Sequence, residues 1–378
     1  MSRKDLKFPE KFPDVFCSTM KKFWEKGVFD EYADEHFLIR AINNDIKGIT
    51  RTLIKKDAAE LKKRVYDKVA LSGFIDNFII NFSAKLTGLC DYFGEDKIEH
   101  FLREQFSAGK TKYNEDVFWE ALSEVHMLYY FVGLGPAFVK NAEYEPRLGA
   151  SNKNPEARLV YENNMILDIE VKTPRFPMRD LLKEHILSLV LLDEEGRKEL
   201  SDFCEKNQVE CCLPRVLKIK DYINSAGGKF ETPANIDHIN LLAINWTYSE
   251  FADTGLFEPI SLFCNHANGL FVNPNVWQSL GIESEAIKKI SAVLLYKMPE
   301  EMLMFGDARY LFIKGNSKLI VNPYAECVNE DAVFKMTHLS TKWPDFDDFK
   351  FAYFDLEREN SEMKMETIWE IINEHILV

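Results

Sequence analysis

The sequence predicts an α/β protein, in which a mixed central sheet is flanked by helices and preceded by an N-terminal α-helical region. In residues 13–106 apolar side chains recur at helical spacing, as do Phe74, Phe78 and Phe82, which is typical of amphipathic helices. From residue 114 onward, helical patterns alternate with short apolar runs of strand length. This alternation indicates a sheet covered by helices.

Three segments follow from these patterns. We expect a helical N-terminal region at residues 1–110, an α/β domain at 111–325 and an acidic C-terminal extension at 326–378. The first boundary lies in the polar stretch 107–114. The extension carries 13 acidic and 5 basic residues, and we expect it to form an edge strand and a terminal helix packed on the core. Docking of a basic partner is the alternative for this segment.

The elements of the α/β domain are predicted in a definite order. A strongly apolar helix at 118–131 comes first. A basic helix at 216–226 lies later in the chain, and the pair Gly227-Gly228 predicts its end. Strands are predicted at about 138–144, 157–162, 166–172, 238–246, 290–297, 310–313 and 319–321, the second and third forming a hairpin.

The predicted strand at 166–172 carries an unusual row of charges. Asp168, Glu170 and Lys172 are two residues apart, so their side chains leave the same face of the strand at intervals of ~7 Å. Charges on an apolar strand require compensation by partner groups, by a metal ion or by water. This face is therefore either part of a salt-bridged network or an active site.

The second interpretation has a specific chemistry. Hydrolysis of a phosphodiester uses a divalent cation that lowers the pKa of the attacking water. Few carboxylates are needed to hold Mg²⁺, and a nearby ammonium group stabilises developing charge. Glu170 and Lys172 supply one carboxylate and the ammonium, and Glu156, at the start of the hairpin, supplies a second carboxylate.

Pro155-Glu156, thirteen further residues, and then Glu170-Val171-Lys172 form a pattern that resembles the PD-(D/E)XK nuclease superfamily. The resemblance implies a restriction-endonuclease-like core, with the order helix, three-stranded meander, helix and strand. It also implies that Glu156 and Glu170 are catalytic residues that bind Mg²⁺, or Mn²⁺ in its place, and that Lys172 acts on the water.

Two further acids extend this implied metal site. Glu124, on the helix at 118–131, corresponds to the additional acid that many members of the superfamily carry there. Asp168 shares a strand face with Glu170 and is a further metal ligand in this interpretation, because Glu156 stands where the family usually has aspartate.

The implied activity is that of a metal-dependent nuclease, with DNA favoured over RNA, in a prokaryotic defence or restriction-type system. The net charge is −14, yet the basic residues are unevenly distributed, so a polyanion can approach one side of the molecule. The candidate nucleic-acid-binding residues are Lys153, Arg158, Arg215, Lys218 and Lys220.

The alternative is a catalytically degenerate protein of the same fold, acting as a nucleic-acid-binding or protein-binding subunit. Glu156 in place of aspartate and the negative net charge both favour it. A protein partner or a homo-oligomer stays open in either case.

We expect a cytoplasmic protein without membrane contact. No segment approaches the roughly eighteen consecutive apolar residues of a membrane span, and the N-terminus lacks the pattern of a signal peptide. The seven cysteines, an odd number in a long chain, favour reduced thiols over a disulfide framework.

Overall fold

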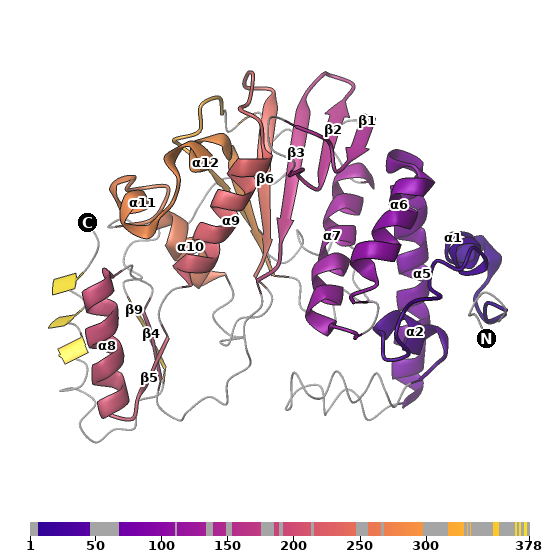
Figure 1. Ribbon diagram of the computed structural model, residues 1–378, viewed down its shortest axis with the longest axis horizontal. Helices are drawn as coiled ribbons and strands as arrows, with labels where there is room; N and C mark the ends of the chain where they lie inside the picture. The colour runs from indigo at the N-terminus through magenta and orange to yellow at the C-terminus, as the bar shows by residue number, and fades with distance from the viewer. Residues whose placement is uncertain are drawn as a thin grey trace.

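A six-stranded mixed sheet occupies the middle of the molecule in the computed structural model (Figure 1). Its strand order is β1-β2-β3-β6-β7-β8. β1, β2 and β3 form an antiparallel meander, β3, β6 and β7 run parallel, and β8 returns antiparallel to β7. The bounds are β1 Val139–Tyr144, β2 Ala157–Tyr161, β3 Ile166–Lys172, β6 His238–Asn245, β7 Ala292–Tyr296 and β8 Ser317–Val321.

The structure describes most of the chain. The described residues are 7–45, 68–109, 112–133, 139–148, 153–174, 185–188, 192–212, 215–246, 256–265, 268–297 and 317–328, with shorter stretches at 331, 333, 351–354, 367–368, 370–371 and 374–375. The strand predicted at 310–313 lies outside them.

Helices cover both faces of this sheet, which confirms the predicted α/β class. On one face, α7 (Glu115–Gly133) packs on β3 and is itself covered by α5 (Lys68–Phe93). The opposite face buries apolar residues of α9 (Val216–Lys229), α10 (Phe257–Cys264), α11 (Asn275–Leu280) and α12 (Ser284–Lys289). The predicted succession of helix, meander, helix and strand appears as α7, β1 to β3, α9 and β6, with two strands and a helix of a second sheet inserted between β3 and α9.

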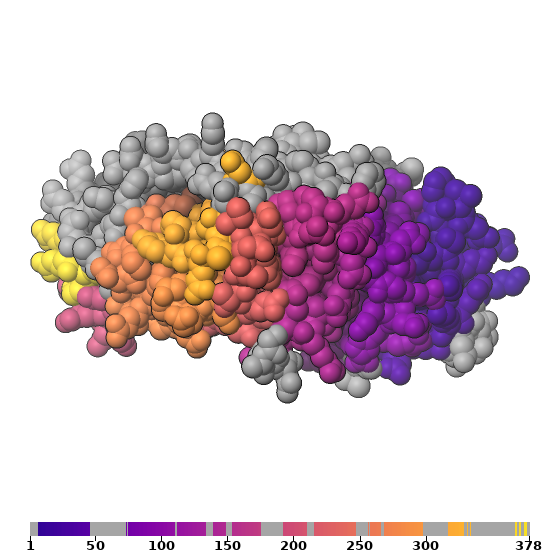
Figure 2. Space-filling view, turned by 90° about the horizontal axis from the view of Figure 1, so that it is seen from above, coloured from indigo at the N-terminus to yellow at the C-terminus, as the bar shows by residue number. Residues whose placement is uncertain are grey.

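The N-terminal helices continue the core of the α/β domain. Phe37, Phe106 and Trp119 belong to one apolar cluster that runs from these helices through α7 to the sheet. Figure 2 shows these helices at one end of an elongated molecule, with later elements following along its length. In the described part of the chain no helix is both long and apolar enough to cross a membrane. These helices are α1 Asp14–Glu25, α2 Phe37–Ile42, α5, α6 Glu95–Phe101 and η2 Leu102–Phe106.

The helix α9 does not end at Gly227-Gly228, and that prediction was wrong. The helix continues through both glycines to Lys229. A Cβ atom on Gly227 would lie 2.3 Å from the Cα atom of Ala286, so this glycine allows α12 to pack closely on α9. The glycine pair therefore serves helix packing, and the added residues bring Lys229 to the sheet.

A second, three-stranded sheet was not predicted. Its order is β5-β4-β9, so β9 (Phe351–Phe354), from the C-terminal extension, is an edge strand, as expected for that segment. β4 (His185–Ser188) runs parallel to β5 (Glu210–Cys212) and antiparallel to β9. The helix α8 (Glu194–Lys206) lies beside this sheet at the end of the molecule opposite the N-terminal helices (Figure 1).

Candidate active site

The charged row of β3 lies on the face of the sheet that α9 covers. Asp168 and Glu170 are fully buried there, on a strand that lies between β2 and β6. The predicted alternation holds, since the intervening residues Leu167, Ile169 and Val171 pack into the opposite apolar cluster.

Glu170 receives two ammonium groups on a single oxygen. Lys172 Nζ lies 2.5 Å and Lys229 Nζ lies 2.6 Å from Glu170 Oε1. The other oxygen, Oε2, is buried and has no hydrogen-bond partner among the described residues. A buried carboxylate oxygen without a partner is costly, so this atom marks a position suited to a cation or a water molecule.

Glu156 lies beside this pair, immediately before β2. Its amide donates to the carbonyl of Ile169 at 2.9 Å, which extends the β2–β3 ladder to Glu156. Its Oε1 lies 3.7 Å from Lys229 Nζ and 3.9 Å from Lys172 Nζ. Burial and the charge of Glu170 raise the pKa of Glu156 to about 7, against the opposing effect of the two lysines. We call Glu156, Glu170, Lys172 and Lys229 the lysine cluster.

Lys172 keeps its charge in this setting. Burial alone would lower its pKa, but the charges of Glu170 and Glu156 outweigh burial, and the pKa is raised. The group is therefore an ammonium at neutral pH, as its predicted role requires.

Glu124, on α7, lines the same cavity as Glu156. It is buried and accepts a hydrogen bond from the hydroxyl of Tyr144 at 2.9 Å. Burial, followed by the charge of Glu156, raises its pKa well above the usual range. Two neighbouring acids with raised pKa values are typical of functional sites, because such sites hold charges that the fold alone does not need.

A cavity of about 360 Å³ opens on this group of residues. Glu124, Glu156 and Lys172 line it, together with Tyr222 of α9 and Gln105 of η2. The N-terminal helical region therefore supplies one wall of the site. The cavity has room for several water molecules or for part of a substrate.

Lys229 was not among the residues predicted for the site. In the sequence it lies just beyond the basic helix predicted at 216–226. The predicted end of the helix at Gly227-Gly228 concealed its position, because the side chain reaches Glu170 only when the helix continues to residue 229. The two adjacent glycines in the sequence do not indicate whether the helix ends at them or continues to Lys229.

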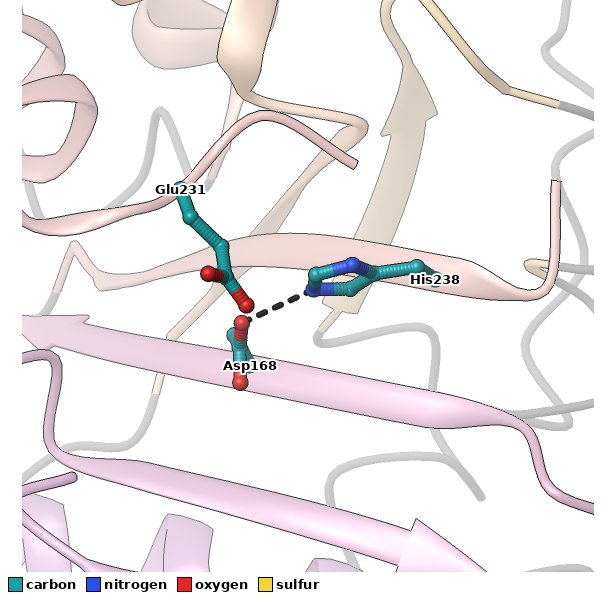
Figure 3. A group of neighbouring side chains, drawn as sticks. All are labelled: Asp168, Glu231 and His238. Carbon is teal, nitrogen blue, oxygen red and sulfur yellow. Dashed lines mark hydrogen bonds and ion pairs between the residues drawn. The ribbon is translucent and has the colours of Figure 1, made fainter. Parts of the chain in front are cut away.

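Asp168 takes part in a different group of residues. Arg158 Nε and Nη2 donate to its two oxygens at 2.7 and 2.6 Å, and His238 Nε2 lies 2.9 Å from Oδ2. Figure 3 shows Glu231 and His238 converging on Asp168. We call Asp168, Arg158, His238 and Glu231 the arginine cluster.

The ligand atoms of Asp168, Glu231 and His238 are close enough together to hold a metal ion. However, Arg158 Nη2 already bonds to both carboxylates, so the chain itself supplies their cation. The predicted contribution of Asp168 to metal binding thus has a competitor in Arg158, whereas Glu170 Oε2 has none among the described side chains.

The predicted nucleic-acid-binding residues have different environments. Arg158 is held in the arginine cluster, and Arg215 pairs with the buried Glu258 at 2.5 Å, so both guanidinium groups already have carboxylate partners within the protein. Lys220 lies 3.5 Å from Asp221 on the surface of α9, while Lys218 and Lys153 are exposed. Among these five, the lysines are the ones placed to meet an external polyanion.

The donor set fits a hard divalent cation. Mg²⁺ and Mn²⁺ prefer carboxylate and hydroxyl oxygens, and Glu156, Glu170 and Glu124 supply the carboxylates. The hydroxyl of Thr173, which also lines the cavity, is buried and has no partner among the residues described. Two oxygens without partners, Glu170 Oε2 and Thr173 Oγ1, therefore lie within three residues of one strand end.

Comparisons with family models, curated proteins and solved structures find no match to this chain. The chemistry of the site is therefore what indicates the function of this protein.

Proposed function

We propose that the protein is a metal-dependent nuclease that hydrolyses phosphodiester bonds of nucleic acid, with DNA favoured over RNA. The observation that carries the proposal is Glu170, a fully buried carboxylate with one oxygen unpaired among the described residues. Glu156 and Lys172 lie against it and also line the cavity. An acid pair with an ammonium group at a cavity is the arrangement that this hydrolysis needs.

A divalent cation held by Glu156 and Glu170, Mg²⁺ or Mn²⁺, would lower the pKa of a bound water and neutralise charge on the phosphate. Lys172 would orient the water and stabilise negative charge that develops on the phosphate oxygens. Glu124, whose pKa is raised by burial and by the charge of Glu156, would support Glu156 from α7. Lys218 and the partly exposed Lys220 of α9 would guide the polyanion toward the cavity.

The alternative is a catalytically degenerate protein that binds a nucleic acid or a protein partner. One observation favours it: Lys172 and Lys229 already compensate Glu170, so the lysine cluster would also be stable as a structural ion network. Such a protein would bind without any requirement for a metal ion at the site.

The proposal includes a cytoplasmic location and a place in a prokaryotic defence or restriction-type system, with a protein partner or a homo-oligomer left open. The cytoplasmic part is supported by free cysteines such as the buried Cys17 and Cys204, which suit a reducing compartment. The place in a defence or restriction-type system is supported by the sequence resemblance to the PD-(D/E)XK nuclease superfamily.

The experiment is a cleavage assay with purified protein on single-stranded DNA, duplex DNA and RNA, in Mg²⁺, in Mn²⁺ and in chelator. We expect metal-dependent cleavage that Lys172→Met abolishes, while Glu205→Gln, a change on the exposed surface of α8, leaves it intact. If the folded protein cut none of these substrates but bound one of them equally with and without metal, the degenerate alternative would replace the nuclease.

A further inference from the structure

The two lysines of the lysine cluster contact the same two carboxylates that would hold a bound cation. Both ammonium groups lie within 3 Å of Glu170 Oε1 and within 4 Å of Glu156 Oε1. These are the two carboxylates that the proposed function assigns to the metal. Together the two lysines bring two positive charges, the same charge that a divalent cation brings.

Glu170 does not need two ammonium groups for its own compensation. One ammonium at hydrogen-bonding distance matches the single charge of a buried carboxylate. The second places two like charges on one oxygen, where the two ammonium groups repel each other. A divalent cation at the same carboxylates would therefore repel both lysines.

The two lysines differ in how firmly they are held. Lys172 belongs to the ladder between the central strands, with Lys172 paired in register with Ile244 of β6. Lys229 is the last residue of α9 and follows two glycines, of which Gly227 packs against Ala286 and Gly228 has no neighbour within 4 Å of an added Cβ atom. Because Lys229 lies at the end of a helix and Lys172 within the sheet, Lys229 is the lysine that we expect to be displaced.

We propose that Lys229 is an internal competitor of the divalent cation for Glu170, and that it sets the affinity of the site for that cation. The inference rests on the proposed function in that it takes Glu156 and Glu170 to be the metal-binding acids. It makes Lys229 a regulatory residue of the site, distinct from Lys172, which stays in place to act on the water.

The test is calorimetric titration of Mn²⁺ into the full-length protein and three variants. Lys229→Met keeps the length of the side chain and removes its charge, and Glu170→Gln removes the contested carboxylate. Lys288→Met removes a partly exposed lysine of α12, outside the lysine cluster, and corrects for the change in net charge. We expect Lys229→Met to bind Mn²⁺ about tenfold or more tightly than wild type, with Lys288→Met within about twofold of wild type.

Thermal unfolding provides a second readout. Lys229→Met should gain more in Tm from a fixed concentration of Mn²⁺ than wild type gains, because tighter binding stabilises the folded state further. In Lys229→Met/Glu170→Gln the gain should disappear.

The outcomes separate this inference from the proposed function. If Lys229→Met binds Mn²⁺ as tightly as wild type or more weakly, the competitor role is overturned and the nuclease proposal still stands. Failure of wild type and Lys229→Met alike to bind Mn²⁺ overturns the metal site itself.

Discussion

Two clusters lie next to each other on one face of β3, and they compensate buried acids in different ways. In the arginine cluster, both oxygens of Asp168 are bonded, to Arg158 and to His238. In the lysine cluster, one oxygen of Glu170 receives two lysines and the other has no partner among the described residues. The acids are two residues apart and equally buried.

The difference indicates a division of labour along the strand. A planar guanidinium that binds a carboxylate at two points forms a closed, specific pair, which is typical of a structural role. An ammonium group is a compact charge that does not impose a planar, two-point geometry on a carboxylate. The two ammonium groups therefore leave Glu170 Oε2 available to another ligand. Burial alone therefore does not distinguish the structural acid from the functional one. The presence or absence of a hydrogen-bond partner on each carboxylate oxygen does distinguish them.

The largest expected effect is on activity. Glu170→Gln should lower metal-dependent cleavage by about 10³-fold or more, because it removes a charged ligand and leaves the shape unchanged. His238→Gln, in the arginine cluster, should stay within about tenfold of wild type. Rates measured on one DNA substrate with circular dichroism as the folding control test the contrast. Equal losses in the two variants would contradict it.

The next effect is on stability. Arg158→Met should lower the free energy of unfolding by about 3–5 kcal/mol, because it leaves Asp168 buried without its main partner. Adding Asp168→Asn to that variant should recover most of the loss. Urea unfolding followed by fluorescence measures both. A loss below about 1 kcal/mol in Arg158→Met would mean that the arginine cluster does little for the fold.

The contribution of the lysine cluster to stability should depend on pH. The pKa of Glu156 is raised in the folded protein from its usual 4.5 to about 7, so the folded state binds this proton more tightly than the unfolded state does. Its contribution to stability is therefore greatest below pH 4.5 and is lost as the pH rises toward 7. Glu156→Gln should then be more stable than wild type at pH 8, by roughly 1–3 kcal/mol, and similar to it near pH 4.

Thermal unfolding in chelator at the two pH values measures this change. A Glu156→Gln variant that is less stable than wild type at pH 8 would contradict this prediction. It would show that the attraction between the two lysines and the charged Glu156 exceeds the cost of burying that charge.

The smallest effects concern the end of α9 that carries Lys229. Gly227→Ala should destabilise the protein by about 1–3 kcal/mol, because its Cβ would lie 2.3 Å from the backbone of Ala286. Gly228→Ala, with free space around its Cβ position, should stabilise the helix by about 0.5–1 kcal/mol. Opposite signs in Tm are expected, and equal shifts would indicate that α9 does not pack on α12 in this way.

Local patterns predicted much of the central fold. Alternation of apolar and charged residues predicted β3 at Ile166–Lys172, and the order of helix and strands around it is observed. The same alternation placed Asp168, Glu170 and Lys172 on one face. These features depend on neighbours in the sequence, and such neighbours are visible without a structure.

Contacts between distant segments were not predictable in this way. The strand β9 pairs with β4, which lies far from it in the sequence, and no local sequence pattern predicts that pairing. Arg158 and Lys229 are both basic residues near acids, yet only the register of β2 and the length of α9 decide which acid each one meets. The separation of Asp168 from the lysine cluster is a result of those two long-range facts.

The most direct measurement of the central claim is anomalous diffraction from crystals grown with Mn²⁺. We predict a manganese peak bounded by the carboxylates of Glu156 and Glu170, with Arg158 still bonded to Asp168. A peak in the arginine cluster, with the lysine cluster empty, would contradict the claim that Glu170 is the open acid of this strand.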